Sequence, residues 1–186
     1  GNQIVYKNPT ATFRIQHLLE MYPNAKFVHI YRNPYEVYSS NLRYHDDVIS
    51  IYTVQNWDRE EIKEGILENY AEMYRCFEEQ KGLIPEGSLV EIKYEDFVKS
   101  PMEHIEHVYS RLGLEGYEEA RPYMEEHVRS QKSYRPNTHV LGKSIVGPVN
   151  RRWGHIVDML GYRRLDETEA PDESSVMTPE MEDVGV

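Results

Sequence analysis

The stretch "KFVHIYRNPYEVYSS", residues 26–40, predicts a buried strand that passes directly into a helix. Its first half is rich in β-branched and aromatic residues and follows a proline turn, as is typical of a buried strand. Asn33 and Pro34 then supply a helix N-cap and a proline at the first helical position. Arg32 stands at the transition, and Ser40 follows it eight residues later. In an open α/β sheet, this transition lies at the carboxyl end of the strand, where ligands bind.

The position of Arg32 suits a phosphate group. Its guanidinium offers a planar fork of donors that matches phosphate oxygens, and the start of the next helix adds unpaired N–H groups and positive potential. Ser40 could add one hydroxyl donor from the same helix. The alternative is that Arg32 pairs with an acidic side chain of the protein and that Ser40 is merely exposed. Spacing alone leaves both interpretations open.

The rest of the chain alternates strands with helices. Apolar runs predict strands at 3–6, 26–31 and 88–93, and helical periodicity predicts helices at about 11–22, 34–45, 57–80, 101–113, 117–129 and 144–160. Such alternation is typical of parallel βαβ units. The expected fold class is therefore α/β, with a parallel sheet of three strands and flanking helices. Because three strands are few for such a protein, we expect the chain to be part of a larger sheet.

The negative charge is concentrated at the end of the chain. Residues 166–186 contain eight acidic residues, no Lys or Arg and few large apolar residues, which predicts a disordered tail. Removing the −8 of this tail from the net charge of −11 leaves −3 for residues 1–165, the predicted folded domain. A local basic pocket is compatible with that balance, although the overall charge argues against a nucleic-acid partner. A partner-binding role for the tail is the alternative to simple disorder.

Composition narrows the remaining classes of function. Cys76 is the only cysteine, so an intrachain disulfide and a thiolate metal cluster are excluded. No run of about 18 apolar residues and no signal peptide is present, which together with the lone cysteine favours a cytoplasmic setting. Sequence upstream of Gly1 lies outside that expectation. His104 and His107 form an H-x-x-H motif but have no third ligand at a spacing typical of zinc sites, so we expect no metal.

Four stretches, in order, resemble the C-terminal portion of sulfotransferases that use 3′-phosphoadenosine 5′-phosphosulfate (PAPS). They cover nearly all of residues 3–162 and read "IVYKNPTATFRI", "YPNAKFVHIYRNPYEVYSS", "VEIKYEDFVKSPMEHIEHVYSRLGL" and "YRPNTHVL…RRWGHIVDMLGY". The resemblance implies a P-loop-like fold, represented here in part. It also implies transfer of a sulfuryl group from PAPS to a hydroxyl or amine acceptor, without a metal.

The resemblance assigns roles to residues near the 3′-phosphate and near the adenine ring of the cofactor. Arg32 and Ser40 match the pair that holds the 3′-phosphate, and Tyr94, which opens "YEDF", matches a tyrosine near the adenine ring. An aromatic face suits a purine because bases gain from stacking. The alternative for Tyr94 is a core tyrosine that ends a strand.

Three cations complete the implied site. Lys7 matches the lysine near the sulfuryl-transfer centre, where an ammonium stabilises negative charge on the leaving group. Lys132 and Arg135 lie in a basic segment that resembles a flexible lid over the nucleotide phosphates. For all three, a solvated surface cation is the alternative.

Two departures from the family pattern limit these expectations. The glycine-bearing loop that cradles the 5′-phosphosulfate is absent, so we expect no turnover from this chain alone. Pro9 occupies the position where many relatives place a general-base histidine, and its side chain cannot accept a proton, so the base is unassigned. Two alternatives stay open: a non-catalytic remnant that binds adenosine 3′,5′-bisphosphate or a protein partner, and a P-loop nucleotide kinase relative. Small molecules, carbohydrates and peptides all stay open as acceptors, because acceptor specificity lies in variable loops.

Overall fold

The computed structural model describes residues 4–52, 54, 58–131 and 141–172. The chain divides into two compact units, each made of two separate stretches of sequence. The first comprises Gly1–Arg32 and Glu68–Asn137, and the second comprises Asn33–Leu67 and Thr138–Val186. Each unit has its own packed interior and is described by itself.

The first unit contains the sheet. Its elements are the 3₁₀ turn η1 (Pro9–Phe13), α1 (Ile15–Met21), β1 (Phe27–Tyr31), the 3₁₀ turn η3 (Lys81–Leu83), β2 (Leu89–Lys93), α5 (Tyr94–Phe97), α6 (Pro101–Leu112), α7 (Tyr117–Ser130) and the later part of α4 (Arg59–Gln80). The second unit is helical. It contains α2 (Pro34–Tyr44), the π-helix η2 (His45–Ile49), α3 (Ser50–Tyr52), the beginning of α4 and α8 (Lys143–Met159).

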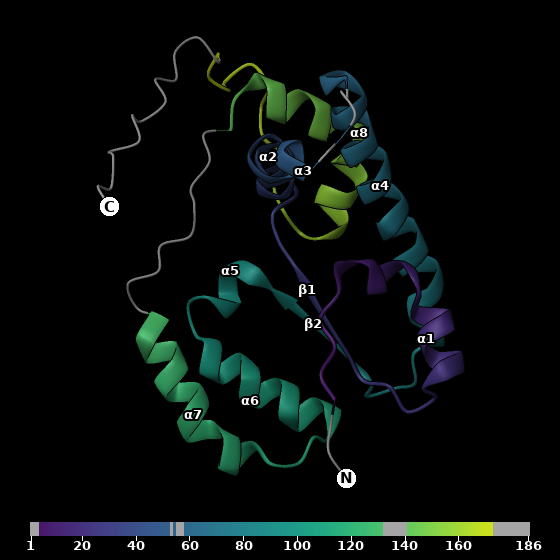
Figure 1. The fold of residues 1–186 in the computed structure, drawn as a ribbon, viewed down its shortest axis with the longest axis vertical. Helices are drawn as coiled ribbons and strands as arrows, with labels where there is room; N and C mark the ends of the chain where they lie inside the picture. The colour runs from purple at the N-terminus through teal and green to yellow at the C-terminus, as the bar shows by residue number, and fades with distance from the viewer. Residues whose placement is uncertain (1–3, 53, 55–57, 132–140, 173–186) are drawn as a thin grey trace. The chain divides into compact units, whose positions relative to one another are not determined.

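The sheet confirms the predicted α/β class. β1 and β2 lie side by side and run parallel, with Phe27 opposite Leu89 and Tyr31 opposite Lys93 (Figure 1). Both strands match the predicted ranges to within one residue at each end. A parallel pair needs a long connection between its strands, and here the intervening chain is mainly helical.

The predicted third strand does not form. Residues 4–6 have no regular structure, and the side chains of Ile4, Val5 and Tyr6 are 92%, 93% and 72% exposed. A strand is held by backbone hydrogen bonds to a neighbour, and the sheet of the described residues consists of β1 and β2 alone. An apolar segment that has no neighbouring strand to pair with therefore has no regular structure. The helix predicted at about 11–22 is also divided, because Arg14 leaves helical geometry between η1 and α1.

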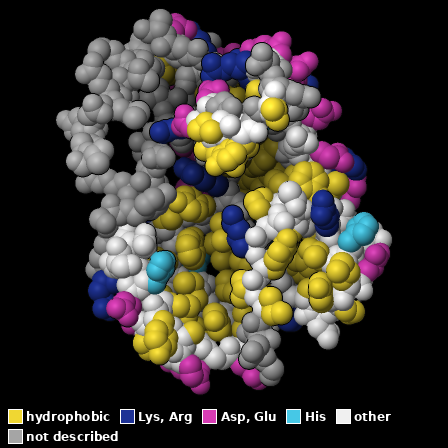
Figure 2. Space-filling view, viewed as in Figure 1, with side chains coloured by type: hydrophobic (Ala, Val, Ile, Leu, Met, Phe, Trp, Pro, Cys, Tyr) yellow, Lys and Arg dark blue, Asp and Glu magenta, His cyan; other side chains and the backbone are white. Residues whose placement is uncertain are grey.

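The two strands are covered unequally on one face. Val90 and Ile92 of β2 pack with Leu112 of α6 in a buried cluster. Val28 and Ile30, their register partners on β1, are 44% and 52% exposed. Figure 2 shows hydrophobic side chains reaching the surface of this first unit. The helical cover of this face therefore protects β2 far better than β1.

The opposite face of the sheet holds an aromatic cluster. His29 lies with its ring centroid 4.2 Å from that of Phe77 and 5.9 Å from that of Tyr74, both on α4. The Nδ1 atom of His29 is 3.2 Å from Oε1 of Glu91, which lies opposite it on β2. His29 is thus a packed, hydrogen-bonded histidine that links β1, β2 and α4.

The interior of the second unit lies between α2 and α8. The side chains of its central residues are at most 1% exposed: Tyr35, Tyr38, Val146, Val149, Trp153, Ile156 and Val157. The indole N–H of Trp153 donates to the carbonyl of Leu67 at 2.7 Å, and its ring meets that of Tyr38 edge to face at 5.4 Å. Burial of this much aromatic surface, with its polar atom satisfied, stabilises the α2–α8 contact.

A set of hydrogen bonds joins α2 and α8 to the chain that follows α8. The Tyr35 hydroxyl donates to Oδ1 of Asn150 at 2.5 Å and accepts from the backbone N–H of Leu165 at 3.0 Å. Nδ2 of Asn150 donates to the Leu165 carbonyl at 2.9 Å. The chain then returns to the start of α8, where Lys143 and Asp172 form an ion pair at 2.9 Å. Residues 166–172 thus contact α8, and residues 173–186 of the predicted tail lie outside the described residues.

No helix within the described ranges combines the length and the apolar character that crossing a membrane requires.

Candidate functional site at the strand ends

The carboxyl ends of β1 and β2 bring Arg32 and Tyr94 together. Because Tyr31 lies opposite Lys93, the next residues, Arg32 and Tyr94, leave the sheet side by side. The guanidinium carbon of Arg32 lies 4.9 Å from the centroid of the Tyr94 ring, within the range of a cation–π interaction. Both residues are half-buried. The sequence therefore places a partly desolvated cation and an aromatic ring at the edge of the sheet where α/β proteins bind ligands.

Local sequence explains why each strand ends where it does. After Arg32, the side chain of Asn33 accepts a hydrogen bond from the Tyr35 N–H at 3.1 Å, and Pro34 occupies the first turn of α2. This is the predicted N-cap with proline, and it turns the chain from strand into helix. After β2, the chain turns at once into the short helix α5, of which Tyr94 is the first residue.

Acidic side chains surround the strand ends. The pKa of the Tyr31 phenol is raised, first by burial and then by the negative charges of Glu91, Asp96 and Glu95. Tyr31 therefore stays neutral at physiological pH and keeps its proton for hydrogen bonding. The same carboxylates disfavour an anion, so a bound phosphate would depend on the cations at this edge.

The other predicted site residues are placed less tightly. Lys7 is exposed in the irregular segment before η1. Ser40 is exposed on α2, in the second unit, whereas Arg32 belongs to the first unit, so each is described within its own unit. Lys132 and Arg135 lie outside the described residues. The structure thus brings Arg32 and Tyr94 together, and the roles of all five residues stay predictions.

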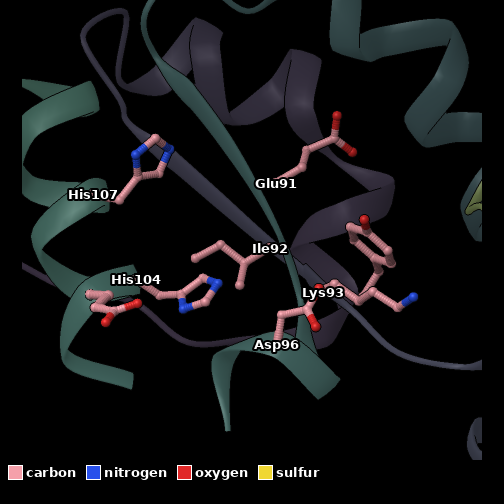
Figure 3. Close-up of a pocket in the computed structure, with 8 residues that line it drawn as sticks. Glu91, Ile92, Lys93, Asp96, His104 and His107 are labelled. Atoms are coloured by element: carbon pink, nitrogen blue, oxygen red, sulfur yellow. The ribbon is translucent and has the colours of Figure 1, made fainter. Parts of the chain in front are cut away.

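A pocket of about 430 Å³ lies beside the strand ends (Figure 3). Its lining comes from β1, β2, α5 and α6 and consists of Tyr31, Glu91, Ile92, Lys93, Asp96, Glu103, His104 and His107. Figure 3 shows His104 and His107 extending from α6 toward β2, and Asp96 extending from α5. Within the described part of the chain, no group of three or more His, Cys, Asp or Glu residues is arranged to hold a metal ion.

Sequence reasoning missed this pocket because its residues come from separate motifs. In the sequence, His104 and His107 were considered only as candidate metal ligands. The signal that could have indicated the pocket is the order β2–α5–α6. Helices that follow a strand closely can pack back against it, as α6 does against β2. Tyr35 was missed for a similar reason, because its partners Asn150 and Leu165 lie far away in the sequence.

Comparison with known proteins identifies the class. Residues 1–119, more than half of the chain, match the model of the sulfotransferase family. The chain therefore belongs to the sulfotransferase family, as the four sequence stretches predicted. Family membership also favours a sulfotransferase over the nucleotide kinase relative that the sequence left open.

Two curated relatives, both mycobacterial, make the comparison more specific. The chain is 32% identical over 161 residues to the omega-hydroxy-beta-dihydromenaquinone-9 sulfotransferase Stf3 of Mycobacterium bovis (strain ATCC BAA-935 / AF2122/97). The protein of the same name from Mycobacterium tuberculosis (strain CDC 1551 / Oshkosh) gives the same identity. Each alignment covers 87% of this chain and 42% of the relative, so the chain spans about two fifths of the length of these relatives. No solved structure gives a significant match.

Proposed function

We propose that the protein to which this chain belongs transfers a sulfuryl group from PAPS to a hydroxyl or amine acceptor. The observation that carries the proposal is the position of Arg32 against Tyr94 at the carboxyl ends of two parallel strands, in a chain of the sulfotransferase family. In this proposal, Arg32 binds the 3′-phosphate of the cofactor together with Ser40, and Tyr94 lies beside the adenine ring.

The contact between Arg32 and Tyr94 has a function in this arrangement. A guanidinium that rests on an aromatic face loses rotational freedom before the ligand arrives, so less entropy is lost on binding. Partial burial also strengthens its attraction to a phosphate, because fewer water molecules screen the two charges. Tyr94 therefore acts both as a neighbour of adenine and as the group that orients Arg32.

The reaction itself is a displacement at sulfur. The acceptor oxygen or nitrogen forms a bond to sulfur while the bond from sulfur to the bridging phosphate oxygen breaks, and adenosine 3′,5′-bisphosphate leaves. The acceptor's proton passes to a base that this chain does not identify. Lys7 would stabilise the charge that grows on the leaving group, and Lys132 and Arg135 would close over the phosphates.

A hydroxyl on an apolar molecule is the acceptor class that we propose to test first. The names of the two relatives specify an omega-hydroxylated dihydromenaquinone, which is lipid-like. In this chain, the segment that follows α2 exposes large apolar side chains, with Ile51 75% and Tyr52 79% exposed. Sulfuryl transfer to hydroxylated lipids, phenols and sugars by the longer protein would rank these acceptors.

The test of the cofactor site is a binding cycle on the longer protein. Arg32→Ala should weaken the binding of adenosine 3′,5′-bisphosphate by about 2–4 kcal/mol, the loss expected for a desolvated bidentate charge contact. Ser40→Ala should cost about 0.5–1.5 kcal/mol, because a neutral hydroxyl is the weaker donor. Calorimetry gives both values. Arg43→Ala is the matched control, because Arg43 is on α2 and pairs with Asp47.

The nucleotide without the 3′-phosphate completes the cycle. If Arg32 reads that phosphate, removing the phosphate and removing the guanidinium delete the same interaction, so their effects should not add. A coupling energy near zero would assign Arg32 to the fold and contradict the proposal. Nucleotide binding without turnover on any acceptor would instead support the non-catalytic alternative.

A further inference from the structure

The pocket between β2, α5 and α6 is rich in hydrogen-bond acceptors. Asp96 and Glu103 line it with their carboxylates, whereas the carboxylate of Glu91, another lining residue, accepts from His29 on the opposite face of the sheet. Among the described residues of the lining, one carries an ammonium, Lys93, and it takes part in an interaction within the protein. Two carboxylates and one ammonium give these lining side chains an excess of negative charge. A ligand that brings donors and positive charge would complement it.

The carboxylates differ in how far the protein already uses them. Glu91 accepts from His29 at 3.2 Å, and Asp96 pairs with Lys99 at 3.1 Å. Among the described residues, no hydrogen bond or ion pair engages the carboxylate of Glu103, which is exposed at the start of α6. Glu103 is therefore the lining carboxylate with the most capacity for a further donor.

His104 adds an acceptor in a fixed orientation. Its Nδ1 atom lies 2.9 Å from the backbone carbonyl of Ser100, one turn earlier. A carbonyl can only accept, so Nδ1 carries the proton, and the neutral ring then has its lone pair on Nε2. The edge-to-face contact with Phe97, at 6.1 Å between centroids, also holds the ring. Figure 3 shows this ring extending from α6 toward Ile92 and Asp96.

The dimensions indicate a small ligand. A volume of about 430 Å³ lies within the range of ordinary small-molecule sites, and Ile92 gives the lining an apolar surface. We propose that this pocket binds a small organic amine in its protonated form, with the ammonium donating to Glu103, Asp96 and Nε2 of His104 and the alkyl part against Ile92. This site is separate in its chemistry from the proposed nucleotide site, which takes an anion.

The experiment is a titration of the full chain with n-butylammonium, followed by two-dimensional ¹H–¹⁵N NMR. We expect shift changes that localise to the backbone amides of residues 91–96 and 103–107. 1-Butanol has the same alkyl chain without the charge, and it should bind much more weakly. Changes spread evenly over the acidic surface, or equal binding of the alcohol, would overturn the proposal.

Variants then assign the contacts. Glu103→Gln should raise the dissociation constant for n-butylammonium roughly threefold, as expected for loss of one solvent-exposed charge pair. The matched control is Glu106→Gln, which removes the same charge from the same helix at an exposed position outside the lining. Equal effects of the two variants would show that n-butylammonium binds through general charge attraction, and they would contradict the proposed site.

His104→Phe tests the imidazole acceptor. The phenyl ring keeps an aromatic neighbour for Phe97 but has no lone pair. The variant should therefore raise the dissociation constant for n-butylammonium about twofold. Retained dispersion of the NMR spectrum shows that the variant is folded. Unchanged affinity in a folded His104→Phe protein would remove His104 from the proposal and contradict the acceptor arrangement that we infer.

Discussion

The α2–α8 core and the β1–β2 sheet achieve stability in different ways. In the core, Trp153 and Tyr35 have no exposed surface, and their polar atoms are hydrogen-bonded. In the sheet, Ile30 is 52% exposed although its register partner Ile92 is only 4% exposed. The side chains of the α2–α8 core are therefore buried by one another. In the sheet, the side chains of β2 that face α6 are buried, whereas those of β1 on the same face are exposed. The more exposed strand, β1, is followed by Arg32, so the proposed ligand-binding edge belongs to the less protected region.

The largest expected effect tests the closed core. Trp153→Ala should lower the free energy of unfolding by about 3–5 kcal/mol, because it leaves a large cavity and removes the indole hydrogen bond to the Leu67 carbonyl. Urea denaturation followed by circular dichroism measures this loss. The control is Tyr123→Ala on α7, whose side chain is 76% exposed and whose removal should cost less than about 0.5 kcal/mol. Similar losses for both variants would erase the distinction between buried and exposed aromatic residues.

A second prediction compares the two strands directly. Ile92→Ala should cost about 2–4 kcal/mol, since Ile92 is buried against α6, while Ile30→Ala should cost less than about 1 kcal/mol. The two residues are identical in type and lie opposite each other, so only their cover differs. The same denaturation measurement applies. Equal losses of stability would show that Ile30 is buried in solution and would contradict the difference in burial between β1 and β2.

The smallest expected effect concerns the polar link across the sheet. The hydrogen bond from His29 lowers the pKa of the Glu91 carboxyl, with the charge of Lys81 acting in the same direction. Because the pKa in the folded state lies below its ordinary value of 4.5, this stabilisation is complete above about pH 4.5 and is lost as the pH falls through the lowered value. Burial raises the pKa of the neighbouring Tyr74 to about 12, so its charge does not change in this range.

The measurement is the difference in unfolding free energy between the wild type and Glu91→Gln at pH 7 and at pH 3. We expect a difference below about 1 kcal/mol at pH 7, since the Glu91 side chain is 41% exposed and solvent screens the pair. That difference should shrink at pH 3. Glu106→Gln, which removes an exposed carboxylate on α6, controls for general charge effects. A difference that grows as the pH falls would contradict the assigned cause.

Local signals explain the parts of the fold and site that could be predicted from the sequence. Each strand that forms is a continuous apolar run, and the rule that parallel strands end at one edge was enough to expect a ligand edge that includes Arg32. The run at residues 3–6 has the same local pattern but no neighbour, so propensity alone gave the wrong result. Pattern also could not separate Ile30 from Ile92, because their burial depends on where α6 lies.

The candidate site divides along the same line. A parallel βαβ arrangement predicts that Arg32 and Tyr94 leave the sheet at the same edge, but their contact depends on the strand register, which the structure shows. The role of Tyr35 could not be predicted, because its bonds to Asn150 and Leu165 cross 115 and 130 residues of sequence. The pocket was equally hidden, since an H-x-x-H motif indicates a helix face but not the strand that faces it.

The discontinuous second unit has a kinetic consequence. Its two parts, residues 33–67 and 138–186, are separated in sequence by 68–137, which belong to the first unit. Trp153 cannot reach Leu67 until that intervening chain has been made and its loop closed, and such non-local contacts slow folding. During synthesis, α2 must therefore emerge and wait with Tyr35 and Tyr38 uncovered until α8 appears. Two residues that are at most 1% exposed in the finished protein are thus left uncovered on the ribosome, which gives α2 a need for a chaperone during synthesis.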